Sequence, residues 1–268
     1  MAIQTQVTTN RPDCTETMCD RQLCRSLVGM SFIKRHRTLQ RGDRLSLSEA
    51  SCRKIWIIVK GMTALCVGLE DGRRQILGLD TRGDTVCGMS TGHQSGAWIE
   101  AFCDTVLCEL DLQMLTRLGT HDAAGDAGGQ LVTDLFGIIH QRLEACSSHL
   151  VTLGRMDSTE RVTLFLLDMA LRIGRSSENG YFVELPMTRE DIADYLGLNT
   201  ETISRIFTRL KKSKLAQFPS RNAFFIPDPA ALQRRLPVAV AEPGDTSSLD
   251  AFLSTIQPCQ VAHKGAGQ

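Results

Sequence analysis

Two short amphipathic helices joined by a tight turn are predicted between residues 188 and 212, and this pattern constrains the fold more than any other. Thr188 can cap the first helix together with Asp191, three residues later. Gly197 permits the left-handed backbone of the turn, and Asn199 caps a second helix. Apolar residues recur at helical spacing, which predicts that the two helices pack together. They are Ile192, Ala193, Leu196, Ile203, Ile206, Phe207 and Leu210.

The outward face of the second helix carries side chains that suit the reading of DNA bases. Arginine can donate two hydrogen bonds to guanine, and a carboxylate can accept one from cytosine. The pattern therefore predicts binding to double-stranded DNA, with the start of the second helix at the base edges. An ion pair between Glu201 and Arg205 is the alternative role of those two residues. The expected base contacts are Glu201, Ser204, Arg205 and Thr208, and the expected phosphate contacts are Arg209, Lys211, Lys212 and Lys214.

The basic footprint for DNA is local, because the whole chain is electrically neutral. Thirty basic and 30 acidic side chains balance, whereas residues 201–222 hold six cations and one anion. The apolar runs are too short to span a membrane, and the N-terminus lacks the features of a secretory signal, so we expect a cytoplasmic protein. We expect no enzyme, because the sequence contains no phosphate-binding loop, serine–histidine–acid set or paired catalytic carboxylates.

The N-terminal half is predicted to be an antiparallel β-roll. Short apolar runs alternate there with glycine turns, and Asp71-Gly72 between two runs is typical of a hairpin. A strand is also expected before the helix pair and another after it. The predicted strands are 55–59, 64–67, 75–79, 181–185 and 223–226.

A long helix is predicted over residues 127–157, after a glycine-rich break at 122–129. Its apolar residues step by three and four, as in a helix that packs along a partner helix, and this favours a homodimer. Burial within its own domain is the alternative. The next helix begins at Asp157, where Glu160 can complete a capping box. The expected dimer interface is Phe136, Ile139, Leu143, Cys146, Leu150 and Leu153.

The segment from Thr188 to Arg205 resembles the helix-turn-helix of the Crp/Fnr superfamily. Within it, Glu201-Thr-Ile-Ser-Arg205 resembles the E-x-x-S-R motif of the FNR and FixK branches. The resemblance implies a homodimer that binds a TTGAT-N4-ATCAA-type palindrome and acts with RNA polymerase. Glu201, Ser204 and Arg205 would read the bases of each half-site.

The resemblance extends from about Cys14 to Leu236 and implies an α+β fold. It implies an N-terminal antiparallel β-roll like that of cyclic-nucleotide-binding domains, a long dimerisation helix and a C-terminal winged helix-turn-helix. The expected parts are a cysteine-rich segment at 1–30, the roll at 31–126, the dimerisation helix at 127–157, the winged domain at 158–236, and a disordered tail at 237–268.

Cys14, Cys19 and Cys24 crowd into eleven residues near the N-terminus. Three thiolates with a fourth from elsewhere can hold an iron–sulfur cluster or zinc. The resemblance to Fnr-type oxygen sensors points to Cys108 as the fourth ligand, in preference to Cys103. It implies a [4Fe–4S] cluster that forms when oxygen is absent, favours dimerisation and DNA binding, and so controls genes for low-oxygen metabolism.

Several alternatives remain open at this point. The x4 and x4 spacing of the cysteines differs from the C-x2-C-x5-C spacing of this branch, so zinc, a thiol switch or no metal role are also considered. A cluster-free FixK-type or nitric-oxide-responsive regulator is one alternative, and an iron–sulfur electron-transfer protein is another. We expect no cyclic AMP, because residues 83–100 contain no arginine to bind its phosphate.

Overall fold

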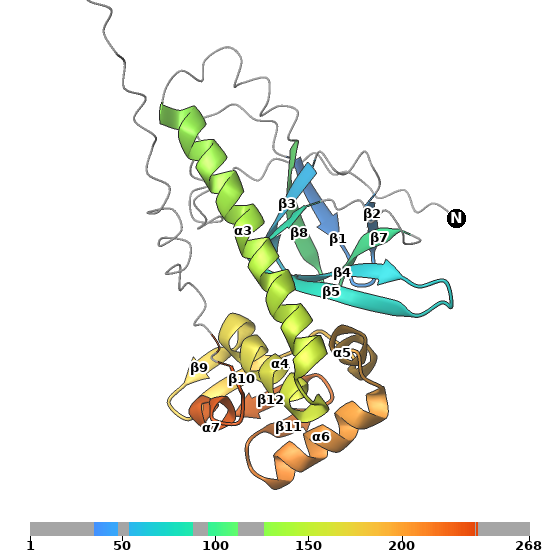
Figure 1. Ribbon diagram of the computed structural model, residues 1–268, viewed down its shortest axis with the longest axis vertical. Helices are drawn as coiled ribbons and strands as arrows, with labels where there is room; N and C mark the ends of the chain where they lie inside the picture. The colour runs from blue at the N-terminus through green and yellow to red at the C-terminus, as the bar shows by residue number, and fades with distance from the viewer. Residues whose placement is uncertain (1–34, 48–53, 88–95, 112–125, 239, 241–268) are drawn as a thin grey trace, which may run out of the picture.

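The computed structural model describes residues 35–47, 54–87, 96–111, 126–238 and 240. Figure 1 shows a β-roll, a long helix α3 along its side, and a winged helix domain beneath both. This architecture confirms the predicted fold class. Within the described ranges, no helix is both long enough and apolar enough to cross a membrane.

The roll consists of two four-stranded antiparallel sheets. Predicted strands at 55–59, 64–67 and 75–79 are confirmed as β3, β4 and β5, and Asp71-Gly72 lies in the hairpin between the last two. One sheet has the order β1 (Arg35–Leu39), β8 (Thr105–Asp111), β3 (Lys54–Lys60), β6 (Thr85–Cys87). The other has the order β2 (Arg44–Leu47), β7 (Ala97–Ala101), β4 (Met62–Gly68), β5 (Arg74–Thr81).

The interior of the roll is mostly apolar, and Glu109 is an acid anchored within it. Trp56, Ile58 and Leu107 are buried there with residues from both sheets. Glu109 lies opposite Trp56 in the strand register and accepts a hydrogen bond of 3.1 Å from the indole. Lys54 contacts the same carboxylate at 2.7 Å, so the buried acid has charged and neutral donors, as a buried carboxylate requires.

Helix α3 (Asp126–Arg155) begins one residue before the predicted range of 127–157 begins and ends two residues before that range ends. We predicted a break at residues 122–129, but Gly128 and Gly129 lie within the helix. A glycine costs a helix only about 1 kcal/mol relative to alanine, and extension of an established helix adds one hydrogen bond per residue. Two glycines at the end of a 30-residue helix therefore do not stop it.

The winged domain follows α3 directly. The capping box of Asp157 and Glu160 and the two predicted strands are confirmed. The segment 175–177 pairs with β10 as strand β9. The elements are α4 (Ser158–Ile173), β9 (Arg175–Ser177), β10 (Gly180–Glu184), α5 (Arg189–Leu196), α6 (Thr200–Lys212), β11 (Gln217–Ser220), β12 (Ala223–Ile226) and α7 (Pro229–Gln233). The sheet order is β11-β12-β10-β9.

Roll and winged domain share one apolar core. The cluster that contains Phe165 of α4 and Ile206 of α6 continues into the roll at Met62, Ile76 and Leu79. The helix pair is therefore packed against the sheet that contains β4 and β5, and the two parts are not independent bodies.

A close backbone approach at Gly180 offers a test of the winged sheet. Gly180 has a φ of +128°, and an added methyl would lie 2.1 Å from the carbonyl oxygen of Ile226. We expect Gly180→Ala to lower the free energy of unfolding by roughly 1–3 kcal/mol, measured by urea denaturation. Gly72→Ala is the matched control, because Gly72 also has a positive φ but faces open space. Equal losses from both substitutions would contradict the steric argument.

Candidate nucleic-acid interface

The predicted helix-turn-helix forms with the expected caps. Thr188 and Asp191 make the capping box of α5. Gly197 ends α5 in the left-handed conformation with a φ of +63°, which lets α6 turn back across α5. Asn199 Oδ1 accepts a hydrogen bond of 2.7 Å from the Thr202 amide and caps α6. Local sequence therefore specifies where both helices begin and where the first one ends.

Helix α6 has one buried face and one exposed face. Its four apolar residues are buried against the domain core. All seven predicted DNA-contacting residues of α6 are exposed on the opposite side, which leaves them available to a ligand as large as a DNA duplex. They are Glu201, Ser204, Arg205, Thr208, Arg209, Lys211 and Lys212. Figure 1 shows α6 at the lower edge of the molecule, away from the roll.

Glu201 and Arg205 also form the ion pair that the sequence offered as their alternative role. Arg205 Nη2 lies 2.5 Å from Glu201 Oε1. Both side chains are at least 70% exposed. An exposed ion pair contributes little to stability because water competes for both charges. The pair therefore orients the two side chains in the free protein and presents no strong barrier to base contacts.

The two hydroxyl residues bond to their own helix. Ser204 Oγ donates to the carbonyl oxygen of Thr200 at 2.9 Å, and Thr208 Oγ1 donates to that of Ser204 at 2.9 Å. Each hydroxyl oxygen keeps its capacity to accept, and each hydroxyl can rotate to donate outward instead. Both groups can therefore serve a base or a phosphate.

A basic group continues past the reading residues. Arg209, Lys211, Lys212 and Lys214 are all exposed. Within the described part of the chain, none of the four forms an ion pair. Their charge is not neutralised locally, and this end of α6 is attractive to an anionic polymer.

Two further arginines join this surface: Arg221, which belongs to the predicted basic footprint, and Arg189, which we did not predict. Arg189, the first residue of α5, stacks over the ring of Phe207 at 4.3 Å. Burial and the nearby charge of Arg221, in the turn between β11 and β12, lower the pKa of Arg189. Arg189 Nη1 is buried and has no hydrogen-bond partner among the described residues. A cation at a helix N-terminus opposes the helix dipole, so Arg189 was already unusual in the sequence.

Of the predicted cluster ligands, the structure describes only Cys108. Cys14, Cys19 and Cys24 lie outside the described residues. Cys108 is in β8 and is fully buried. It lies opposite Ile57 in the register, whereas Trp56 and Glu109 share the inner face of the roll. Alternation along the strand therefore puts the Cys108 thiol on the outer face of the sheet.

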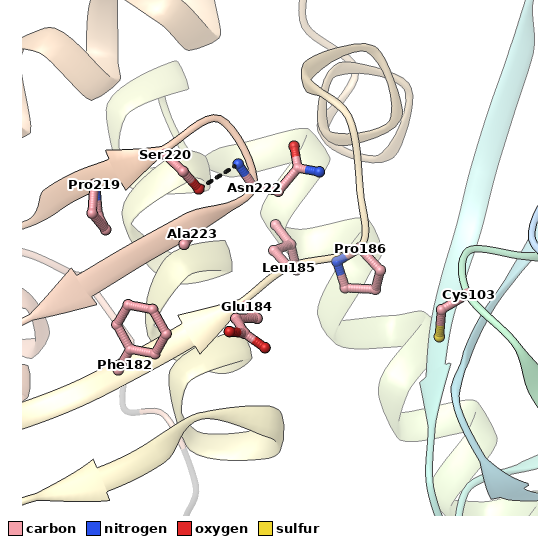
Figure 2. Close-up of a pocket in the computed structure, with 9 residues that line it drawn as sticks. All are labelled: Cys103, Phe182, Glu184, Leu185, Pro186, Pro219, Ser220, Asn222 and Ala223. Atoms are coloured by element: carbon pink, nitrogen blue, oxygen red, sulfur yellow. Dashed lines mark hydrogen bonds between the residues drawn. The ribbon is translucent and has the colours of Figure 1, made fainter.

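Cys66 is poorly suited to hold a metal, and Cys103 lies at a cleft. Burial raises the pKa of Cys66 to about 12, and a thiol must lose its proton to become a ligand. Cys103 lies beside a cleft of about 610 Å³ between the roll and the winged sheet. In Figure 2 it stands on the roll side, facing residues of β10, β11 and β12 and their connections. The described residues contain no cluster of three or more potential metal ligands.

The apolar stripe of α3 is largely exposed. Phe136, Ile139, Leu143 and Leu150 are 59–71% exposed, and Val151, which the spacing did not include, is also exposed. Cys146 and Leu153 are half-buried, and Leu153 lies beside the turn at Gly197. Large exposed apolar side chains in one stripe are typical of a protein–protein interface.

Comparison with known proteins identifies the family. Residues 36–122 match the cyclic nucleotide-binding domain, and residues 160–235 match the Crp-like helix-turn-helix domain. The chain is 33% identical over 195 residues to the nitrogen fixation regulation protein FixK of Azorhizobium caulinodans, an alignment that covers 72% of this chain and 76% of that protein. The chain is a transcription regulator of the Crp/Fnr family.

A second relative and a solved structure are also similar to this Crp/Fnr regulator over most of its length. It is 28% identical to the transcriptional activator protein FnrL of Cereibacter sphaeroides, over 80% of this chain and 86% of that protein. The solved structure of FixK2 from Bradyrhizobium japonicum superposes with a TM-score of 0.65 and 26% identity, over 78% of this chain and all of that one. The resemblance noted in the sequence is therefore confirmed at the level of family and fold.

Proposed function

We propose that this regulator binds a TTGAT-N4-ATCAA-like palindrome as a homodimer, and that an iron–sulfur cluster held by its cysteines makes binding respond to oxygen. The observation that carries the DNA part is the exposed face of α6. It presents an acid, a hydroxyl and a guanidinium at Glu201, Ser204 and Arg205, on a helix whose other face is buried. These are groups that distinguish bases in the major groove.

Phosphate contacts would surround this reading face. Arg209, Lys211 and Lys212 extend along α6, and Arg189 with Arg221 adds a second basic region at the start of α5 and the wing. Contacts of this kind set affinity and register but not sequence preference. A DNA-binding regulator with these features would act in the cytoplasm, where DNA and RNA polymerase, its expected partner, are found.

The stripe on α3 would form the dimer interface. Burying Phe136, Ile139, Leu143 and Leu150 against a second copy removes large apolar surfaces from water, which favours association. A palindrome presents the same half-site twice, so a two-fold symmetric dimer matches its symmetry.

Cys14, Cys19, Cys24 and Cys108 would hold the [4Fe–4S] cluster. Cys108 fits this role because its thiol lies on the outer face of the roll and is shielded from solvent. The cluster would supply sensitivity to oxygen, which breaks it. Relatives include FnrL and a fumarate and nitrate reduction regulatory protein of Vibrio cholerae, which supports control of low-oxygen metabolism.

A cluster-free FixK-type regulator is the second candidate. The matches to FixK of Azorhizobium caulinodans and to the FixK2 structure favour it. In that case the cysteines would have no cluster to hold, and DNA binding would not depend on oxygen. Zinc at the same cysteines is a third outcome of the same test.

Replacing a base-reading side chain is expected to change specificity. Arg205→Ala should lose about 1–3 kcal/mol of binding free energy and relax the preference at one base pair. Lys212→Ala is the matched control: it should weaken binding to all duplexes alike and reduce the salt dependence of affinity. Fluorescence anisotropy with singly substituted palindromes measures both effects. If the two variants behave alike, the assignment of base and phosphate roles is wrong.

A charge in the apolar stripe is expected to separate the dimer. Leu150→Asp would bury an unpaired carboxylate in the interface, so sedimentation at micromolar concentration should show monomers. Ser148→Asp is the control, because Ser148 is exposed and lies about 200° around the helix from Leu150. A dimer that survives Leu150→Asp would exclude this surface.

Cluster binding has a visible signature. Anaerobically purified protein should be brown, contain iron and sulfide, and bleach in air, and Cys108→Ser should remove the colour. Cys103→Ser should retain it, because we assign no ligand role to that thiol. Colourless wild-type protein with bound zinc would support the zinc alternative, and colourless protein without metal would support the FixK-type regulator.

A further inference from the structure

One arginine of the roll contacts three carboxylates, two of which belong to the helix-turn-helix. Arg74 Nε lies 2.7 Å from Asp194 Oδ2, and Arg74 Nη1 lies 3.1 Å from Glu100 Oε2. Arg74 Nη2 donates to Asp191 Oδ1. The arginine side chain is only 17% exposed. We call this arrangement the Arg74 clasp: Arg74 on β5, Glu100 on β7, and Asp191 and Asp194 on α5.

On the α5 side, the clasp includes the residue that caps the helix. Asp191 Oδ2 accepts from the Thr188 amide at 2.7 Å and from Thr188 Oγ1 at 2.8 Å, while its other oxygen accepts from Arg74. The start of α5 and the end of the β4–β5 hairpin therefore share one carboxylate. A shift of α5 relative to the roll would disturb its cap as well as the clasp.

On the roll side, the clasp is anchored within the sheet. Glu100 Oε2 also lies 3.0 Å from Arg44 Nε and accepts a hydrogen bond of 3.0 Å from the Trp98 indole. Burial alone would lower the pKa of Arg74, but its hydrogen bonds to Asp194 and Asp191 raise that pKa overall. The planar guanidinium with partners in three directions has little freedom to reorient.

The other end of α5 has its own attachments. Arg161 of α4 donates to the carbonyl oxygen of Leu196 at 3.0 Å and to that of Leu153, at the end of α3, at 2.6 Å. Gln75 Nε2 donates to the carbonyl oxygen of Tyr195 at 3.4 Å. One attached end would leave α5 free to pivot, whereas two attached ends determine its direction.

The clasp does not cover the DNA-reading face. Glu201 and Arg205 are highly exposed while the clasp is closed. The Arg74 clasp is therefore not an autoinhibitory contact. The property of α6 that it can affect is the direction in which the helix points. Because α5 and α6 pack together, a fixed α5 fixes α6.

We propose that the Arg74 clasp sets the half-site spacing that the dimer recognises, by holding α6 at a fixed angle to the dimer helix α3. This inference rests on the proposed binding of a palindrome by a dimer. Each added base pair moves one half-site by roughly 3.4 Å and about 34° relative to the other. Selection of one spacing therefore requires a rigid connection from α3 to α6. Arg142 of α3 contacts Asp80 of β5 at 2.5 Å, so β5 connects α3 to the clasp.

The test compares neighbouring arginines of one hairpin. Arg74→Gln removes the clasp, and Arg73→Gln is the matched control, because Arg73 is 76% exposed and, among the described residues, forms an ion pair only with Asp71 in the same turn. Binding is measured for duplexes in which two TTGAT half-sites are separated by three, four, five or six base pairs. We expect Arg74→Gln to lose about tenfold in affinity at the preferred spacing and to bind the other spacings nearly as well. Preference for TTGAT over a scrambled half-site should stay unchanged, and Arg73→Gln should match the wild type.

Asp194→Asn covers the case in which Arg74→Gln fails to fold. Loss of Arg74 leaves three carboxylates close together without their shared cation. Asp194→Asn instead removes one of the three ion pairs and keeps those of Arg74 with Glu100 and Asp191. This variant should show a smaller change in spacing preference in the same direction. Folded variants that keep the wild-type spacing preference would overturn the inference. Wild-type protein that does not distinguish the palindrome from scrambled duplex would instead overturn the proposed function, and the inference with it.

Discussion

The arrangement of this molecule depends on the charges of strand β5 and the turn that follows it, because each buried charge needs a partner and each partner comes from a different helix. Arg74 pairs with α5, Asp80 with Arg142 of α3, and Asp84 with Arg172 of α4. A buried charge left alone is costly. The three ion pairs form together only when all three helices occupy their observed positions around the sheet. The charges therefore specify the orientation of these helices relative to β5 more sharply than apolar packing alone.

The shared core and these ion pairs make the roll and the winged domain one mechanical unit. Leu107 of β8 packs in the roll interior with Leu65 of β4, β4 pairs with β5, and Arg74 of β5 contacts Asp194 of α5. The exposed stripe on α3 and the exposed face of α6 are both attached to that strand. In the proposed regulator, these contacts within one chain would couple dimerisation through α3 to DNA binding through α6.

Local features were predictable where short-range chemistry determines them. The caps at Thr188 and Asn199 and the turn at Gly197 were read directly from the sequence, because each depends on neighbours within four residues. The start of α3 was predicted to within one residue, but the break at 122–129 was predicted wrongly over 126–129, because two glycines cost an established helix too little to end it. Arg189 was missed, because 32 residues separate it from Arg221 in the chain and only the winged sheet brings the wing to the start of α5.

The sequence by itself determined the main helices, five of the strands, the family resemblance and the chemical character of the reading helix, because periodicity, capping and motif spacing are local properties. Only the tertiary structure decided which face of the sheet bears Cys108, which apolar residues of α3 remain exposed, and which carboxylates meet Arg74. Those outcomes depend on strand register and on contacts between residues more than a hundred positions apart. Such contacts form because one arrangement of the chain both pairs the buried charges and removes the apolar surface from water. No short segment of the sequence specifies that arrangement.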